Sequence, residues 1–81
     1  MTEQPIGKIT HYFPKIAVAA ATLTGELKVG DRIRVKGHTT DFTETIESLE
    51  IEHQKVDRAG PGDKVAFEVS EKARPGDQVF R

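Results

Sequence analysis

Three cations alternate along one stretch of the chain, and they have the type and spacing that could hold an anionic ligand. Arg32, Arg34 and Lys36 flank the apolar Ile33 and Val35, so a strand here would place all three cations on the face opposite the core. Neighbouring cations on that face would stand about 7 Å apart, close to the separation of phosphates along a nucleic-acid strand. Such contacts would be sensitive to salt and weakly selective. The alternative is an ordinary solvated strand face.

Two further cations and an aromatic cluster lie earlier in the chain. Lys8 and Lys15 would extend the basic patch if the first hairpin lies beside it. His11, Tyr12 and Phe13 would offer a surface on which an unpaired base could stack. The alternative for this cluster is that it closes one end of the fold and caps the core.

The sequence offers no arrangement that predicts catalysis or metal binding. His11, His38 and His53 are separated by 27 and 15 residues, which matches no compact ligand motif. The chain has no cysteine, so it can form neither a thiolate metal site nor a disulfide. The glutamates near His53 are better explained as a solvated face than as a catalytic pair. We therefore expect no catalytic residue, no metal and no cofactor.

The length and composition of the chain limit the number of domains it can form and the cellular location it can have. Its 81 residues allow one domain with one small core. The net charge of −1 conceals an asymmetry, because residues 1–38 carry six bases and three acids whereas residues 39–81 carry six bases and ten acids. The longest apolar run, residues 16–21, is far short of the roughly 20 residues of a membrane-spanning helix. With no cysteine and no secretory signal, we expect a cytoplasmic protein without membrane contact.

Turn signals recur along the chain at the spacing typical of all-β domains. Residues 29–33, 61–65 and 75–79 each place Gly-Asp just before a β-branched residue, where glycine supplies the turn conformation and aspartate can accept hydrogen bonds from nearby amides. Between the turns, the alternation of apolar and polar residues predicts strands. The predicted strands cover residues 6–12 with a possible bulge at Gly7, residues 16–21, residues 32–36 and residues 65–69.

The stretch 41–57 supports two interpretations. Its large apolar residues fall at helical spacing, and Asp41 with Glu44 resembles a capping box. Its many β-branched residues favour a strand instead, and that strand would need a bulge near residues 47–48. The pattern alone does not decide between the helix and the bulged strand.

Three segments in order resemble the second domain of translational GTPases such as elongation factor Tu. They are residues 25–31 (Gly-Glu-Leu-Lys-Val-Gly-Asp), residues 56–65 (Val-Asp-Arg-Ala-Gly-Pro-Gly-Asp-Lys-Val) and residues 74–79 (Arg-Pro-Gly-Asp-Gln-Val). The resemblance implies an all-β fold, a small closed six-stranded antiparallel β-barrel with Greek-key connections. It implies a bulged strand at residues 45–52, a barrel domain over residues 5–81 and a tail at residues 1–4.

The resemblance also implies a site and shows what the chain lacks. In elongation factor Tu this domain helps to hold the aminoacyl end of transfer RNA; of the matching positions Glu50 is retained and His53 replaces an arginine, while the first-strand positions fall on Gly7, Lys8 and Thr10. No phosphate-binding loop is present, because the glycines before Lys64 have the wrong spacing and no hydroxyl residue follows it. We therefore expect no nucleotide to bind this chain alone.

Two functions remain open at this point. In the first, the chain is a non-catalytic barrel that contacts ribosomal RNA, transfer RNA or a translation-related protein, with a partner supplying the GTPase or catalytic function. In the second, it is a protein-interaction subunit that docks onto a separately encoded catalytic chain of the collagenase-like peptidase family without touching nucleic acid; similar barrels occur at the C-terminus of such proteins.

Overall fold

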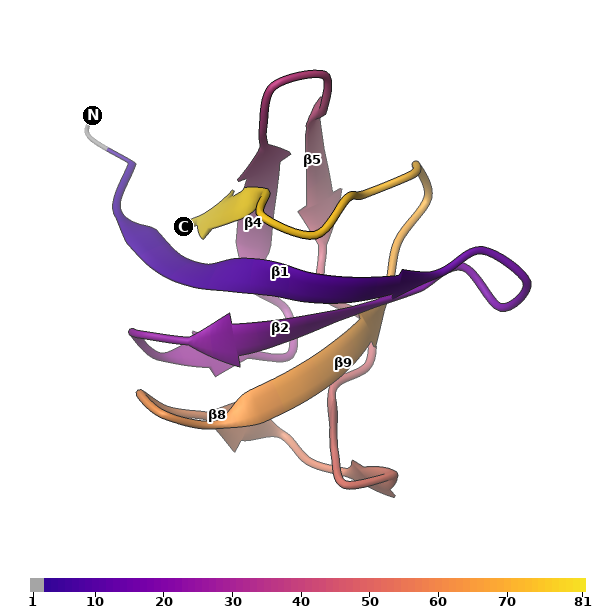
Figure 1. The fold of residues 1–81 in the computed structure, drawn as a ribbon. Coiled ribbons are helices and arrows are strands. Elements are labelled where there is room, and N and C mark those ends of the chain that lie inside the picture. The colour runs from indigo at the N-terminus through magenta and orange to yellow at the C-terminus, as the bar shows by residue number, and fades with distance from the viewer. Residues whose placement is uncertain (1–2) are drawn as a thin grey trace.

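A computed structural model describes residues 3–81, and in that range every regular element is a β-strand (Figure 1). The all-β prediction is therefore confirmed. The strands are β1 (Pro5–Phe13), β2 (Val18–Leu23), β3 (Leu27–Lys28), β4 (Arg32–Lys36), β5 (Asp41–Thr45), β6 (Glu50–Ile51), β7 (Gln54–Lys55), β8 (Arg58–Ala59), β9 (Lys64–Glu68) and β10 (Gln78–Phe80). The described residues include no helix long and apolar enough to cross a membrane.

The strands form one large antiparallel sheet and one small ribbon. The sheet has eight strands in the order β5-β4-β10-β1-β2-β9-β6-β7, and β3 pairs with β8 in a separate two-stranded ribbon. β1 and β2 form the most extensive pairing. The register of β1 against its other neighbour, β10, shifts between Pro5 and Gly7, which confirms the predicted bulge.

The prediction of a closed six-stranded barrel is wrong, because β5 and β7 are free ends of the sheet order. The physical reason lies just after β5. Ile46 donates its amide hydrogen to the Asp31 carbonyl oxygen and accepts one from the Gly30 amide, both at 2.8 Å. Its backbone groups are thus taken by the turn before β4 and make no ladder with β6 or β7. The pairing of β3 with β8 continues by one residue toward the same turn, where the Val29 amide donates to the Asp57 carbonyl oxygen at 2.9 Å.

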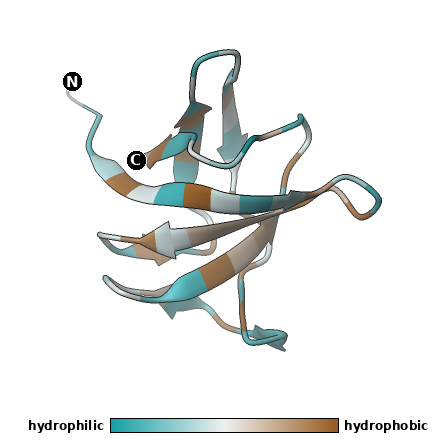
Figure 2. Ribbon diagram, viewed as in Figure 1, coloured by the Kyte–Doolittle hydropathy of each residue, from teal (hydrophilic) through white to brown (hydrophobic). Residues whose placement is uncertain are grey.

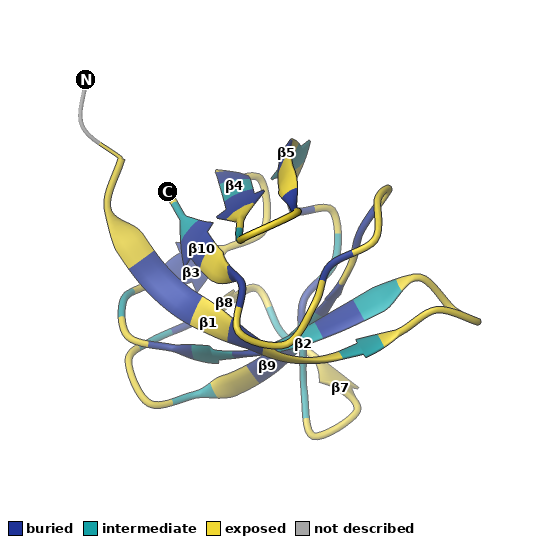
Figure 3. Ribbon diagram, turned by 45° about the horizontal axis from the view of Figure 1, so that its top comes forward, coloured by how far each residue is buried: buried dark blue, intermediate teal, exposed yellow. Residues whose placement is uncertain are grey.

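The core lies on the inner face of the curved sheet. Figure 2 shows apolar and polar bands alternating along β1, and Figure 3 shows the corresponding alternation of buried and exposed residues. β4 and β9 have the same inward and outward alternation, so the predicted strands at residues 32–36 and 65–69 are confirmed. The largest fully buried side chains are Phe67, Ile9, Leu23, Leu27, Ile33, Ile46, Leu49, Val35 and Val79.

The three predicted Gly-Asp turns share one geometry. Gly30, Gly62 and Gly76 have φ angles of 97°, 90° and 96°, the value required at the third position of a type II turn. In each turn the following aspartate accepts a hydrogen bond through Oδ2 from the amide three residues earlier, at 2.8–3.0 Å. The predicted role of both residue types is confirmed, and the turns lead into β4, β9 and β10.

Two other predictions need correction. β2 begins at Val18 rather than at residue 16, because Ala17 has a φ of 53° and residues 14–17 form the turn of the β1–β2 hairpin. The helical interpretation of residues 41–57 is wrong, since this stretch contains β5, β6 and β7. The bulged strand is replaced by an irregular segment, residues 46–49, between two short strands. Residues 1–2 of the proposed tail at residues 1–4 lie outside the described range. The boundary between this tail and a domain over residues 5–81 therefore remains a prediction.

Candidate functional site

The central cation of the basic strand is already engaged by acids of this chain. Arg34 donates through Nε and Nη2 to the two carboxylate oxygens of Asp41 at 2.8 and 2.7 Å, and through Nη1 to Glu3 at 3.1 Å. The bidentate hydrogen bonds hold the pKa of the Asp41 carboxyl below its usual value and raise the pKa of Arg34 further. A phosphate would have to displace these carboxylates, so the predicted row of three free cations is reduced to Arg32 and Lys36.

The Arg34–Asp41 pair predicts a pH-dependent contribution to stability. Because the pKa of Asp41 is lowered in the folded state, its stabilising contribution is complete above the unfolded value of 3.8 and disappears as the pH falls through the folded value. The Arg34 and Asp41 side chains are 32% and 51% exposed, so solvent screens the pair and the effect is small. The difference in urea midpoint between the native chain and Asp41→Asn should shrink in acid. A difference that is equal at neutral and acid pH would contradict the prediction.

The structure separates the other two predicted cations. Lys8 lies opposite Gln78, and Gln78 lies opposite Lys36, so Lys8 and Lys36 occupy one row across three strands about 10 Å apart. Lys15 instead lies in the β1–β2 turn, which projects from the body of the fold in Figure 1. The predicted basic patch is therefore not continuous.

The aromatic cluster is divided between the surface and the core. The rings of His11 and Phe13 lie on the same side of β1 with their centroids 4.4 Å apart and tilted by 45°. Phe13 is 42% exposed, whereas Tyr12 is half-buried against the core. The cluster therefore combines features of both interpretations: Tyr12 packs as a capping residue, and Phe13 is free to contact a ligand.

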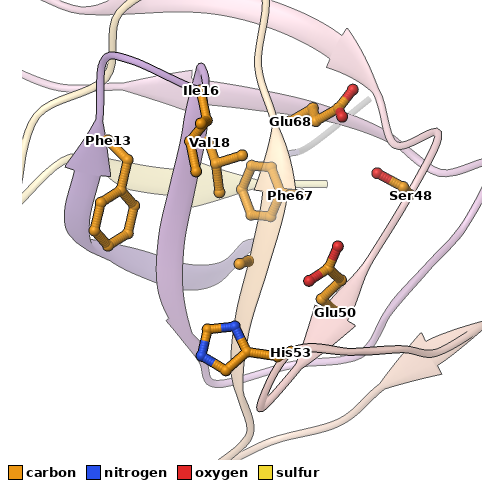
Figure 4. Close-up of a pocket in the computed structure, with 9 residues that line it drawn as sticks. Phe13, Ile16, Val18, Ser48, Glu50, His53, Phe67 and Glu68 are labelled. Carbon is orange, nitrogen blue, oxygen red and sulfur yellow. The ribbon is translucent and has the colours of Figure 1, made fainter.

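A groove on the outer face of the sheet collects the remaining site residues (Figure 4). It has a volume of about 260 Å³ and lies across β2, β9 and β6, with the β1–β2 hairpin on one side and the β6–β7 turn on the other. The register explains the composition of its floor: Val18 lies opposite Glu68, and Ala66 lies opposite Glu50, so these four side chains share the outer face. The lining residues are Phe13, Ile16, Val18, Ser48, Glu50, His53, Ala66, Phe67 and Glu68.

The groove is amphipathic. In Figure 4 the apolar side chains of Phe13, Ile16 and Val18 lie on the side of the first hairpin, and the carboxylates of Glu50 and Glu68 lie on the opposite side. Glu50 and His53 both line the groove. In the sequence they were singled out only by the resemblance to translation-factor domains. The described residues contain no group of three or more side chains suited to a metal ion. The arrangement suits recognition of a group that is apolar on one side and cationic on the other.

The sequence patterns left most of this groove unidentified. Ile16 was expected to lie in a strand, and Glu68 was not singled out as a site residue. Strand pairing was the missing information, because Val18 and Glu68 are 50 positions apart and meet only through the β2–β9 register. The one available signal was the alternation in residues 65–69, which already placed Glu68 on the face opposite Phe67.

Comparison with known proteins identifies relatives among proteases. No family model matches the chain. An uncharacterized protease of Methanocaldococcus jannaschii is 34% identical over 76 residues, which cover 93% of this chain and 19% of the relative. A collagenase of Porphyromonas gingivalis is 36% identical over 78 residues, which cover 94% of this chain and 22% of the relative. The chain thus spans about a fifth of the length of the curated relatives it matches.

Two solved structures share the fold. The selenomethionine variant of the C-terminal domain of a Geobacillus thermoleovorans protein assigned as a U32 peptidase has a TM-score of 0.92 at 23% identity, covering 96% of this chain and 99% of that domain. A second structure of that domain has a TM-score of 0.87 at 25% identity, covering 91% and 86%.

These relatives overturn the resemblance to translation factors. The proteins similar over nearly the whole chain are a protease, a collagenase and the C-terminal domain of a U32 peptidase. The expectation of a translation elongation factor-like protein that binds RNA and the ribosome was therefore wrong. By sequence and fold, the chain is similar to a domain that forms a minor part of larger protease-type proteins.

Proposed function

We propose that this chain is a non-catalytic docking domain that associates with the catalytic part of a collagenase-like peptidase of the U32 type. The observation that carries the proposal is the pattern of coverage: the match takes in 94% of this chain but 22% of the collagenase relative. The matching region is about a fifth of the collagenase, and its fold is that of the C-terminal domain of a U32 peptidase. We therefore place the catalytic residues of such a peptidase in the other four fifths of its chain.

The chemistry of the described residues supports a binding role. The groove holds two carboxylates, a histidine and a serine, but Glu50 and Glu68 come from adjacent strands on an outer sheet face that is open to solvent. Such a surface can recognise a partner without excluding water from a reacting bond. The cytoplasmic location expected from the absence of cysteine remains a prediction.

Association with a catalytic chain is directly testable. The purified 81-residue chain, titrated by calorimetry against the collagenase-like catalytic chain encoded in the same genome, should form a stoichiometric complex. The chain alone should hydrolyse neither gelatin nor casein, whereas the catalytic chain should change its activity or stability when the complex forms. A structurally unrelated small β-domain is the control. Hydrolysis by this chain alone, or the absence of a complex at any ionic strength, would overturn the proposal.

A further inference from the structure

We propose that the groove on the outer face of β2, β9 and β6 binds a protein segment in which an aliphatic or aromatic side chain lies next to a lysine or arginine. This inference rests on the proposed docking function and specifies the chemistry of the partner. It commits to a basic-apolar peptide segment as the occupant, supplied by the catalytic part of the peptidase.

The apolar half of the groove is the first observation. Ile16 is 63% exposed and Phe13 is 42% exposed, and these are two of the three large hydrophobic side chains left exposed among the described residues. Both flank the same groove, where Val18 continues the apolar surface toward the floor (Figure 4). Covering such neighbouring side chains with an apolar group removes that surface from water. The volume of about 260 Å³ suits one large side chain rather than an extended ligand.

The acidic half of the groove supplies the charge complementarity. Glu50 and Glu68 face outward from adjacent strands, and no lysine or arginine belongs to the lining. Lys55 lies opposite Glu50 in the β6–β7 hairpin, yet within residues 3–81 neither groove carboxylate forms an ion pair. A cation beside the apolar group would find two unpaired carboxylates, whereas an anion would be repelled.

The β6–β7 turn, which borders the acidic half of the groove, has a defined conformation in the absence of a partner. Ile51 lies opposite Gln54, so the β6–β7 hairpin turns through the two residues Glu52 and His53, which have φ angles of 51° and 66°. Both residues carry a side chain in the left-handed region that glycine normally occupies, and this conformation fixes the position of His53 at the groove. A preformed wall lowers the entropic penalty of binding.

A peptide titration tests the groove directly. The probe is a fluorescein-labelled peptide in which a central leucine is flanked by two arginines, followed by fluorescence anisotropy at low salt. Neutralising both carboxylates in Glu50→Gln/Glu68→Gln should weaken binding about fivefold, and Ile16→Ser should weaken it about tenfold. Glu26→Gln, an exposed carboxylate outside the groove lining, is the matched control and should bind as the native chain does.

Two control peptides separate the contributions. Replacing the arginines of the probe with glutamates should abolish binding, and replacing the leucine with serine should weaken it about as much as Ile16→Ser. Affinity should fall as salt is added, because the charge contribution is screened. Equal binding of the basic and acidic peptides would overturn the inference, as would unchanged binding by the Glu50→Gln/Glu68→Gln and Ile16→Ser variants.

The same variants distinguish this inference from the proposed function. If the native chain binds the catalytic chain and the groove variants bind it equally well, the groove assignment is wrong and the docking function stands. If the native chain does not bind the catalytic chain, the docking function is wrong, and the peptide titration then decides on its own whether the groove recognises basic-apolar segments. Circular dichroism of each variant confirms that the fold is retained.

Discussion

Replacing Phe67 with alanine should lower the free energy of unfolding by about 3–5 kcal/mol. Phe67 is 2% exposed and is the largest of the fully buried side chains. It lies on β9 between β2 and β6, so its ring fills the space behind the strands that form the groove. A chain of this length has a total stability of only about 4–12 kcal/mol, so the loss would leave a large unfolded population. Denaturation in urea, followed by far-ultraviolet circular dichroism, measures it.

Two other substitutions make this prediction specific. Phe13→Ala removes the same ring from a position that is 42% exposed, and should change stability by less than about 1 kcal/mol while weakening partner binding. Phe67→Leu keeps most of the buried volume and should lose less than Phe67→Ala, which gives a folded variant if the alanine protein does not fold. Equal losses for Phe67→Ala and Phe13→Ala would contradict the burial of Phe67.

The features that the sequence predicts well are those determined by near neighbours. The type II turns depend on four consecutive residues each, and glycine at the third position with aspartate at the fourth is a sufficient signal. Alternation in β4 and β9 depends on five consecutive residues with one face in the core. The alternation of apolar and polar residues within each segment is enough to predict that Ile33 and Phe67 point into the core.

The features that it predicts poorly depend on distant partners. Ile46 and Leu49 are both buried and three positions apart, which is helical spacing. Their burial arises instead because the irregular segment between β5 and β6 bonds to other parts of the chain: Ile46 to the turn before β4, and Leu49 to the Val56 amide at 2.9 Å. The same long-range bonds leave the sheet open, so periodicity could reveal neither the segment nor the lack of closure.

In the candidate site, too, the sequence predicts what depends on near neighbours and misses what depends on distant strands. Alternation alone identifies Glu68 as outward-facing, and resemblance alone singles out Glu50 and His53. That all three line one groove with Ile16 depends on the β2–β9 and β9–β6 registers. The basic strand, in contrast, had the clearer sequence pattern, but Arg34 is taken by Asp41 seven residues later. A regular row of charges does not indicate whether the partner is a ligand or the adjacent strand.

Replacing Gly37 with alanine should destabilise the protein by about 2–3 kcal/mol. A Cβ atom at this position would overlap Asp77 Oδ1 and would lie 2.5 Å from Asp77 Cγ. Asp77 cannot move aside at low energy, because it is 4% exposed and its Oδ2 accepts the Arg74 amide hydrogen at 2.8 Å within the turn before β10. Its carbonyl oxygen also accepts the Ile9 amide hydrogen at 2.7 Å. The added methyl group must therefore displace either the end of β4 or this turn.

Gly60→Ala is the matched control for Gly37→Ala, because a Cβ atom at Gly60 would meet nothing within 4 Å. It should leave stability unchanged or raise it slightly, since alanine restricts the unfolded chain more than glycine does. A double-mutant cycle identifies the contact: in an Asp77→Ala background the carboxylate is gone, and Gly37→Ala should destabilise the protein much less than in the native background. Additive effects of the two substitutions would show that Gly37 is required for a reason other than the close approach of Asp77.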